Sequence, residues 1–369
     1  MTMDASPSLL GDPVITQTPG KVILMGEHAA VYGQPALIAA IDLWMTVQVS
    51  PSDDGSISLH LGNLDHRETV TWDEVKAYAK KARKQWHAYI HAAHENTFSS
   101  ILGRDPANLV KIAMGEALLH RNLPADAGCM ISIFSEQPIG AGVGSSAALA
   151  VGLLNALHEY YGLPLENDSL FNLALNVERR QHGTPSGIDP VTVLRGGVVW
   201  AEPDDSGALG FRNVDIASPA LSRIQLYHTG LPNESTGDVV DAVRKRRQTS
   251  PSTVNALLER MGRLTRQLYR LLQDETQAGP MVECIRAYQA CLEDLGVVPA
   301  EVRRVVREIE AAGGAAKISG AGTLTGSGAG SLLVYHPEKE PEELAEPLQS
   351  FEKYHVTLGA AGTRRVASV

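Results

Sequence analysis

A glycine-rich loop between a strand and a helix constrains this chain more than any other feature. The loop follows a predicted strand, Met130–Phe134, and leads into a predicted Ala/Leu-rich helix, Ser146–Tyr161. Glycine lacks a Cβ, so the backbone can approach a ligand closely, and the N–H groups at a helix start attract anions. The loop therefore predicts a phosphate-binding site. It runs Pro138-Ile139-Gly140-Ala141-Gly142-Val143-Gly144-Ser145-Ser146.

Two common phosphate-binding patterns do not fit this loop. A Walker A loop needs Gly-Lys-Ser/Thr, and the loop contains no lysine. A Rossmann fingerprint that starts at Gly140 and Gly142 needs a glycine where the chain has Ser145. The simpler alternative is a structural glycine turn in which a serine caps the helix. Taken alone, the loop leaves phosphate binding and a structural turn both open.

The composition excludes several classes of protein. Lys+Arg number 32 and Asp+Glu 42, and the resulting net charge of −10 argues against a nucleic-acid partner. No stretch approaches the roughly 20 apolar residues of a membrane helix. The N-terminal segment lacks the basic flank that a signal peptide carries. The three cysteines form no CxxC pair. We therefore expect a cytoplasmic protein that does not bind membranes.

The order of predicted elements indicates an α+β fold, because few helices alternate singly with strands. The length of 369 residues suggests two domains. The polar, turn-forming segment Glu202–Gly207 is the predicted border, which divides the chain into 1–205 and 206–369. Further strands are predicted over Val14–Thr18, Lys21–Met25, Met45–Val49, Ser56–Leu61, Ile224–Tyr227, Ala315–Ser319, Ser331–Tyr335 and Tyr354–Leu358. Further helices are predicted over Asp73–Glu95, from Asp105 onward, and over Asp168–Gln181, 236–247, 253–274, 280–294, 299–312 and 340–352.

Four motifs together resemble those of mevalonate kinases. The glycine loop resembles the second motif of the wider superfamily of galactokinases, homoserine kinases, mevalonate kinases and phosphomevalonate kinases. The four occur in family order between residues 19 and 330. The other three are the segment from Pro19 to Gly33 with Gly26-Glu27-His28, the segment Gly183-Thr184-Pro185-Ser186-Gly187-Ile188-Asp189, and Lys317-Ile318-Ser319-Gly320-Ala321-Gly322.

The resemblance implies a two-domain small-molecule kinase with its active site in the cleft between the domains. Such an enzyme uses ATP and Mg²⁺ to phosphorylate the 5-hydroxyl of mevalonate to 5-phosphomevalonate, an isoprenoid precursor, and homodimers occur in the family. Two alternatives stay open. The chain could phosphorylate another small alcohol or sugar acid, or it could be a catalytically silent ligand-sensing member. The presence of Lys21 and Asp189 argues against the silent member.

The resemblance also implies a role for individual residues. Asp189 matches the catalytic carboxylate that receives the proton of the acceptor hydroxyl, and Lys21 matches the lysine beside it. Ser146 and Glu178 match the magnesium ligands, and the loop from Gly140 to Ser146 binds ATP. Glu27 and His28 would lie near the carboxylate end of mevalonate or support the lysine.

Each assignment has a simpler alternative in the residues themselves. Asp189 could end a turn before Pro190, and Lys21 could be an ordinary strand lysine. Ser146 could be only a helix cap, and Glu178 could be only a solvated ion pair. A lone histidine such as His28 is more often a structural hydrogen-bond partner.

Several features depart from the family's motif pattern or suggest a different kind of site. Thr323-Leu324-Thr325 interrupts the second glycine block, which ends in Gly326-Ser327-Gly328-Ala329-Gly330. Ser235 and Thr236 either approach the active site or cap a helix. The histidines 87, 91 and 94 with Glu95 fit a solvated helix face better than a zinc site. The run Arg244-Lys245-Arg246-Arg247 is either an exposed helix end or an anion-attracting cluster.

Overall fold

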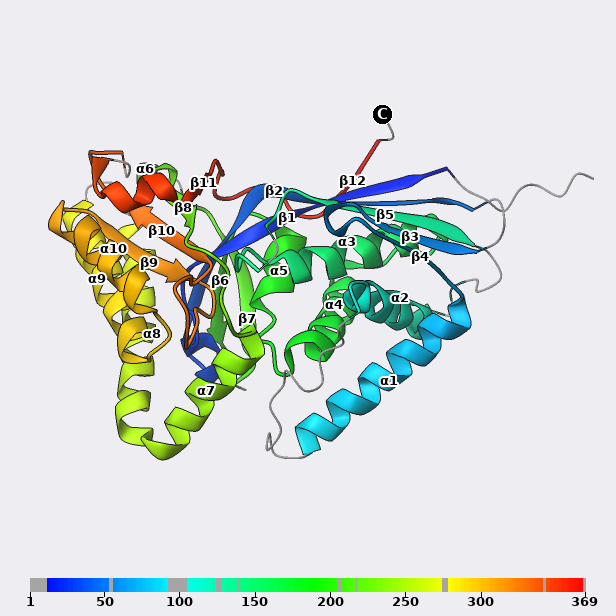
Figure 1. Cartoon of the computed structure of the whole chain (residues 1–369), viewed down its shortest axis with the longest axis horizontal. Helices are drawn as coiled ribbons and strands as arrows, with labels where there is room; N and C mark the ends of the chain where they lie inside the picture. The colour runs from blue at the N-terminus through cyan, green and yellow to red at the C-terminus, as the bar shows by residue number, and fades with distance from the viewer. Residues whose placement is uncertain are drawn as a thin grey trace, which may run out of the picture.

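The computed structural model describes residues 12–52, 56–91, 105–121, 123, 128–138, 140–204, 207–216, 218–273, 278–340 and 343–367. Two sheets lie side by side, each covered by helices (Figure 1). The larger sheet has the strand order β12-β1-β2-β5-β3-β4, with β6 pairing with β2 and β7 pairing with β6. Its strands are β1 (Val14–Met25), β2 (Ala36–Pro51), β3 (Ile57–Leu61), β4 (His66–Val70), β5 (Cys129–Ser135), β6 (Val198–Pro203), β7 (Leu209–Val214) and β12 (Arg364–Val366).

Strand β2 organises the larger sheet because it has three partners. It pairs with β1 along most of its length, while its first half pairs with β6 and its second half with β5. The sequence predicts two short strands on either side of Pro19-Gly20, whereas the structure has one strand, β1, with a register shift between these two residues. A proline cannot donate to a ladder and is tolerated at such irregularities, so the strand continues through it to Lys21.

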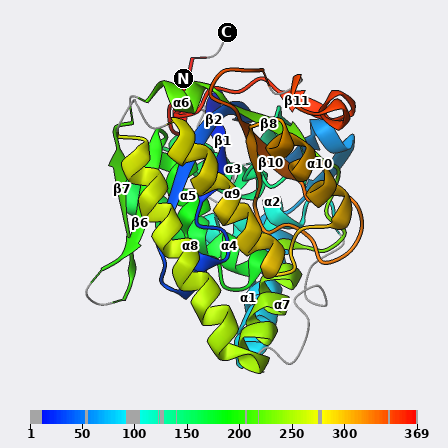
Figure 2. The ribbon, with the colours of Figure 1, turned by 90° about the vertical axis from the view of Figure 1, so that its left-hand side faces the viewer.

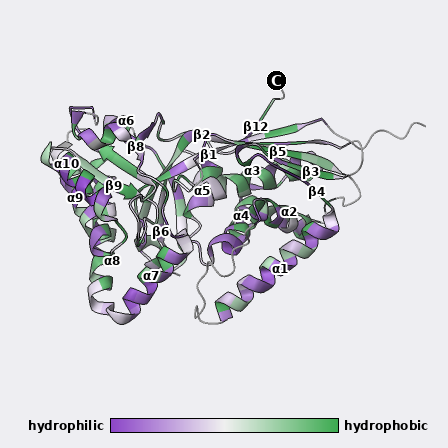
Figure 3. Cartoon of the chain, in the orientation of Figure 1, coloured by the Kyte–Doolittle hydropathy of each residue, from purple (hydrophilic) through white to green (hydrophobic). Residues whose placement is uncertain are grey.

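Helices cover one face of the larger sheet in successive layers. The helix α3 (Ser145–Tyr160) packs directly on β1 and β2, and most of its side chains are buried. The helices α2 (Asn108–Arg121), α4 (Asn167–His182) and α5 (Ile188–Arg195) contact α3, and α1 (Trp72–His91) packs outside α2. The hydropathy colouring follows this order, because α3 is mostly apolar and the outer helix α1 mostly polar (Figure 3).

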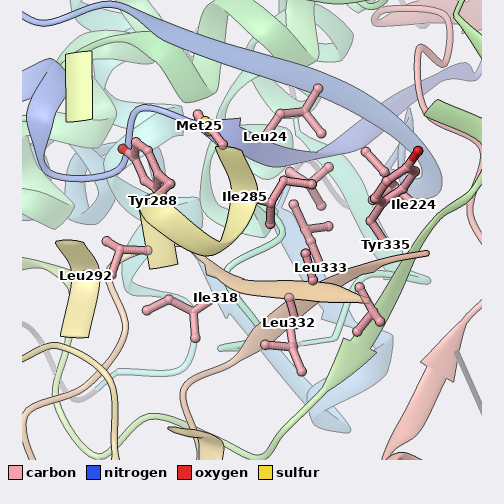
Figure 4. Close-up of a cluster of buried hydrophobic side chains, with 14 of the residues drawn as sticks. Leu24, Met25, Ile224, Ile285, Tyr288, Leu292, Ile318, Leu332, Leu333 and Tyr335 are labelled. Atoms are coloured by element: carbon pink, nitrogen blue, oxygen red, sulfur yellow. The ribbon is translucent and has the colours of Figure 1, made fainter. Parts of the chain in front are cut away.

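The smaller sheet has the antiparallel order β11-β8-β10-β9. The helices α9 and α10 pack against its strand β9, and α8 lies beside α9 in the side view (Figure 2). Apolar side chains of β9, β10 and α9 pack together with Leu24 and Met25 at the end of β1, which joins the two halves in one core (Figure 4). The elements are β8 (Ile224–His228), β9 (Ala315–Ser319), β10 (Ser331–Tyr335), β11 (Glu352–Tyr354), α6 (Pro219–Ser222), α7 (Thr236–Thr249), α8 (Pro251–Leu271), α9 (Ala278–Asp294) and α10 (Ala300–Ala311).

The structure confirms most predicted elements and, besides the two strands that merge into β1, contradicts two more. The helix predicted over 340–352 is wrong, because the described part of this range has only 3-10 and turn conformations, including Glu346–Ser350, before it enters β11. The last strand is also displaced: β11 ends at Tyr354, and Leu358 makes only an isolated bridge to Ile41. Strands β6, β7 and β12 were not predicted: β6 is a continuous apolar run without alternation, β7 alternates only over its first four residues, and β12 has only three residues.

The two residues at the predicted domain border, 205 and 206, lie outside the described residues. On either side of them β6 and β7 pair as antiparallel neighbours within the larger sheet. The chain leaves this sheet after Val214 and enters the smaller sheet at Ile224. We therefore propose that the border between the two units lies between Val214 and Ile224.

All three cysteines are buried free thiols, as expected for a chain without a disulfide framework. Cys284 and Cys291 belong to the core that joins α9 to the smaller sheet, as their seven-residue spacing on one helix face predicts. Among the described helices, none combines the length and apolar character needed to cross a membrane.

A buried carboxylate holds three helices of the first unit together. Glu116 of α2 is buried and accepts two hydrogen bonds from Arg83 of α1, at 2.8 and 2.6 Å. Arg180 of α4 lies 3.7 Å from the same carboxylate and stacks on Trp86. Removing one partner of a buried ion pair is costly because the remaining charges keep their desolvation penalty.

We expect Glu116→Ala to lower the free energy of unfolding by about 3 kcal/mol, since two guanidinium groups lose their counter-ion. The control is Glu308→Ala, which removes the exposed partner of Arg304 and should cost less than about 0.5 kcal/mol. Urea denaturation measures both. Equal losses in the two variants would contradict the role given to Glu116.

Candidate active site

A buried lysine meets a carboxylate where β1 passes the start of α5. Lys21 Nζ lies 3.1 Å from Asp189 Oδ2, and its side chain is 4% exposed while that of Asp189 is 30% exposed. The ammonium also donates to the carbonyl of Gly142, at 3.2 Å. Asp189 stands in the first turn of α5, after Gly187 at φ +86°. The carboxylate is therefore held by a cation while one side of it stays open to a ligand.

The glycine loop lies directly on this lysine. Gly140, Gly142 and Gly144 all have φ between +76° and +80°, a conformation that side chains with a Cβ rarely adopt. At Gly144 an added Cβ would come within 2.7 Å of Lys21 Cγ. Gly144 is also the N-cap residue of α3, so the loop lies at the positive end of the helix dipole. The geometry fits a main-chain cradle for an anion.

A serine and a glutamate meet beside the loop. Ser146 Oγ, in the first turn of α3, donates to Glu178 Oε1 of α4 at 2.5 Å. His182, one turn further along α4, lies 3.3 Å from the hydroxyl and 3.7 Å from the carboxylate. Burial raises the pKa of Glu178, and the His182 ring and the Ser146 hydrogen bond oppose that rise. Two hard oxygen ligands next to a phosphate cradle fit the needs of Mg²⁺.

Glu27 has a close charged partner in the smaller sheet. It forms a fully buried ion pair with Lys317 of β9, whose ammonium also donates to the carbonyl of Ile23. Tyr288 of α9 donates to the backbone carbonyl of Glu27 and accepts from Gly26 N–H. Burial raises the pKa of Glu27 and lowers that of Lys317, and the attraction within the pair opposes both shifts. This pair ties the first motif to the last one.

His28 is buried in an unusual backbone conformation. Its φ is +57°, which is uncommon for any residue other than glycine. The ring Nε2 lies 2.9 Å from the carbonyl of Ala321 and must donate to it, which leaves Nδ1 as an acceptor. Nδ1 is buried and has no hydrogen-bond partner within the described structure. An unpaired buried acceptor of this kind is available for the hydroxyl of a ligand.

The two glycine blocks pack against each other through their backbones. An added Cβ at Gly142 would come within 3.0 Å of the carbonyl of Ser319, and one at Gly330 within 3.0 Å of that of Ala141. Ser331 Oγ donates to the carbonyl of Ala141 at 2.6 Å. The second block therefore supports the phosphate loop, as the resemblance implies.

The Thr323-Leu324-Thr325 interruption is held by one carboxylate. Glu234, just before α7, accepts hydrogen bonds from both threonine hydroxyls and from the Leu324 N–H. Burial disfavours the charged form of Glu234, but these hydrogen bonds outweigh it and lower the pKa of this carboxyl group to about 2. The segment that departs from the family pattern is thus fixed in place by its hydrogen bonds to Glu234, here called the Glu234 anchor.

The structure brings most of the predicted residues together. Lys21, Asp189, Ser146 and Glu178 meet around the glycine loop, and His28 approaches the second block at Ala321. Ser235 acts as the N-cap of α7 by accepting from Asp238 N–H. His87 and His91 stack on α1, while His94 and Glu95 lie outside the described residues.

Sequence reasoning missed three residues of this region. His182 follows Glu178 at a helical spacing of four, which could have placed it beside the same ligand set. Lys317 is part of the quoted last motif, but its pairing with Glu27 depends on a contact between segments 290 residues apart. Glu234 had no sequence signal, because its partners lie 89 to 91 residues away.

Comparison with known proteins decides the family. Residues 108–197 match the family model described as the N-terminal domain of GHMP kinases. Over 397 aligned residues the chain is 31% identical to a mevalonate kinase from Bos taurus, and the alignment covers 96% of this chain and 95% of the relative. The chain belongs to the mevalonate kinase family.

Other members of the family agree with this result. A mevalonate kinase from Thermococcus sibiricus is 30% identical over 335 residues, covering 89% of this chain and 91% of the relative. The crystal structure of the Methanococcus jannaschii mevalonate kinase is 21% identical and covers 97% of this chain and 99% of that one, with a TM-score of 0.72. This structural match confirms the expected α+β kinase fold.

We expect the Glu234 anchor to make stability depend on pH. Its folded pKa, about 2, lies below the ordinary 4.5. The stabilisation is therefore fully present above about pH 4.5 and is lost as the pH falls toward 2. Glu234→Gln should lower the Tm by roughly 2 °C at pH 7, and the Tm difference from the wild type should shrink as the pH is lowered from 6 toward 3. A difference that does not change with pH would contradict this assignment.

Proposed function

We propose that this chain transfers the γ-phosphoryl group of ATP to the 5-hydroxyl of mevalonate, giving 5-phosphomevalonate and ADP for isoprenoid synthesis. The observation that carries the proposal is the 3.1 Å contact between Lys21 and Asp189 against the glycine loop. If Lys21 were an ordinary surface lysine and Asp189 merely ended a turn, the two side chains would not meet inside the protein. Membership of the mevalonate kinase family supports the choice of acceptor.

Asp189 and Lys21 would prepare the acceptor. The exposed side of the Asp189 carboxylate takes the proton of the 5-hydroxyl as that oxygen forms its bond to the γ-phosphorus and the bond to the ADP oxygen breaks. A positioned base of this kind contributes about 10²–10⁴-fold. The Lys21 ammonium holds the carboxylate in place and stabilises the negative charge that develops on the acceptor oxygen.

The glycine loop would hold the triphosphate through main-chain donors. The residues Gly140 to Ser146 present backbone N–H groups at the positive end of α3, where anionic oxygens are stabilised. These donors are fixed before the reaction, so they need no reorganisation as charge develops. A protein with a net charge of −10 can bind a polyphosphate in this way because the attraction is local.

Ser146 and Glu178 would hold Mg²⁺. The 2.5 Å approach of their oxygens, the burial of Glu178 and the adjacent cradle together fit a hard divalent cation. When bound, the ion neutralises phosphate charge during transfer. The chain's own part is to keep Glu178 oriented, which the neighbouring His182 does from the same helix.

His28 is the residue best placed to recognise the acceptor. Its buried Nδ1 can accept a hydrogen bond from a substrate hydroxyl, while Nε2 is fixed by Ala321. Burial lowers the pKa of this ring, and the Ala321 hydrogen bond opposes that shift, so the neutral form is favoured at pH 7. Glu27 would act indirectly by fixing the turn that carries His28 through its pair with Lys317.

We also propose a cytoplasmic enzyme that works on small molecules and assembles as a homodimer. Three buried free thiols suit a reducing compartment. Light scattering of the purified chain measures the oligomeric state directly.

An assay of ADP release tests the proposed reaction against its alternatives. The chain is supplied with ATP and Mg²⁺ and then with mevalonate, galactose or homoserine. ADP formed with mevalonate alone supports the proposal. ADP formed only with another alcohol would assign a different acceptor, and no ADP with any of the three would favour a ligand-sensing member.

We expect Asp189→Asn to lower kcat by about 10²-fold or more while ATP binding is retained, because the amide cannot take the proton. Asp168→Asn is the control, since Asp168 is an exposed residue of α4. Steady-state kinetics and nucleotide titration measure the two effects. An unchanged kcat would remove Asp189 from the chemistry.

We expect Ser146→Ala to raise the Mg²⁺ concentration needed for half-maximal activity about tenfold, since one of two protein oxygens is lost. Ser145→Ala keeps the Ser146 hydroxyl and serves as the control. The measurement is a Mg²⁺ titration at saturating ATP and mevalonate. Identical titration curves for the wild type and Ser146→Ala would count against a metal at this position.

A further inference from the structure

The turn between α4 and α5 brings Asp189 to the proposed site. It begins at Gly183, with φ +78°, and ends at Gly187, with φ +86°. Glycine has the widest backbone freedom of any residue, so two glycines within five residues leave the turn free to move unless other groups hold it. Lys21 restrains the Asp189 carboxylate from one side only. The position of the turn therefore depends on contacts from elsewhere in the fold.

Trp86 of α1 provides such a contact. Its indole Nε1 donates a hydrogen bond of 2.7 Å to the carbonyl of Gly183. Gly183 is buried, and a buried carbonyl that loses its donor is costly. The helix α1 packs mainly on α2 and touches α4, so it stands outside the layer that carries the site (Figure 1). The hydrogen bond thus ties the catalytic turn to a helix that contributes no group to the proposed chemistry.

The ring face of the same tryptophan holds α4 just before the turn. The guanidinium of Arg180 lies 4.5 Å from the centre of the Trp86 ring, and the arginine side chain is only 8% exposed. Its Nε and Nη1 are buried without a hydrogen-bond partner among the described residues, so the π face of the ring is a favourable neighbour for this cation. Arg180 stands between Glu178 and His182 on α4. One indole therefore contacts both the last turn of α4 and the start of the catalytic turn.

The helix α1 holds Trp86 between two anchors. Three residues before it, Arg83 pairs with the buried Glu116 of α2. Three residues after it, the buried Tyr89 donates to the carboxylate of Asp241 in α7, with oxygen distances of 3.0 and 3.2 Å. Residues three apart lie on the same side of a helix. Trp86 is thus presented from a segment that is fixed on both sides, which suits a group that must hold another one still.

We propose that Trp86 is a positioning residue for the phosphoryl transfer. By fixing Gly183 and Arg180, it sets the place of Asp189 after the turn and of Glu178 before it. This inference rests on the proposed function, because it assigns Trp86 to the same reaction. Displacing reacting groups by about 1 Å can cost about 10²-fold in rate, so a residue that touches no reacting atom can still control turnover. A purely structural tryptophan would affect stability and leave kcat unchanged.

The kinetic test is Trp86→Phe, which keeps an aromatic face for Arg180 and removes the N–H that Gly183 accepts. We expect kcat to fall about tenfold, while the KM values for ATP and mevalonate stay unchanged, because the turn shifts but the binding groups remain. The Tm should fall by only about 2 °C, since one hydrogen bond is lost from a large fold. Steady-state kinetics and thermal melts measure these effects.

Trp200→Phe is the matched control. The indole of Trp200 in β6 donates to Glu202 at 3.1 Å, and Arg212 lies 5.9 Å from its ring centre. The control therefore removes the same kind of hydrogen bond beside the same kind of cation, and none of these groups belongs to the turn. It should keep the wild-type kcat. An equal loss of kcat in the two variants would overturn the proposal, as would a wild-type kcat in Trp86→Phe with or without a lower Tm.

Hydrogen exchange gives a readout that needs no turnover. The backbone amides of residues 183–189 should exchange faster in Trp86→Phe than in the wild type, because the turn opens more easily without its donor. In Trp200→Phe they should exchange at the wild-type rate. Equal exchange of this segment in all three proteins would overturn the role given to Trp86. A wild type that releases no ADP with mevalonate would instead reject the proposed function, and the exchange of the turn would still decide whether Trp86 holds it.

Discussion

One buried ammonium group holds the site together. Lys21 Nζ contacts Asp189 of α5 and the carbonyl of Gly142, so a single charge joins β1, the glycine loop and the catalytic turn. The backbone of the same lysine donates to the carbonyl of Val143 at 2.8 Å. This arrangement requires glycine at position 144, where a Cβ would strike the lysine stem. The phosphate cradle and the carboxylate are thereby fixed relative to each other before any substrate binds.

Two other buried carboxylates are paired with cations. Glu27 is matched by Lys317, and Glu116 by Arg83 and Arg180. Each pair joins segments that are distant in the chain, so removing one partner would leave a charge desolvated.

The sequence predicted the local elements well where a short-range signal existed. The strands β9 and β10 have the predicted bounds, and α3 begins one residue before the predicted Ser146. The prediction was wrong over 340–352, where the described residues form only 3-10 and turn conformations before β11. The single strand β1 was also missed, because the bulge at Pro19-Gly20 is stabilised by its partner β2 and leaves no local signal.

The sequence by itself determined which groups are available for catalysis and binding: a glycine loop before a helix, a lysine in a strand and an aspartate after a glycine turn. These are local patterns, and each follows from backbone conformation within a few residues. Only the tertiary structure decided which of these groups meet and that Glu27 faces Lys317. Such contacts arise from the packing of segments hundreds of residues apart, and spacing along the chain carries no record of them.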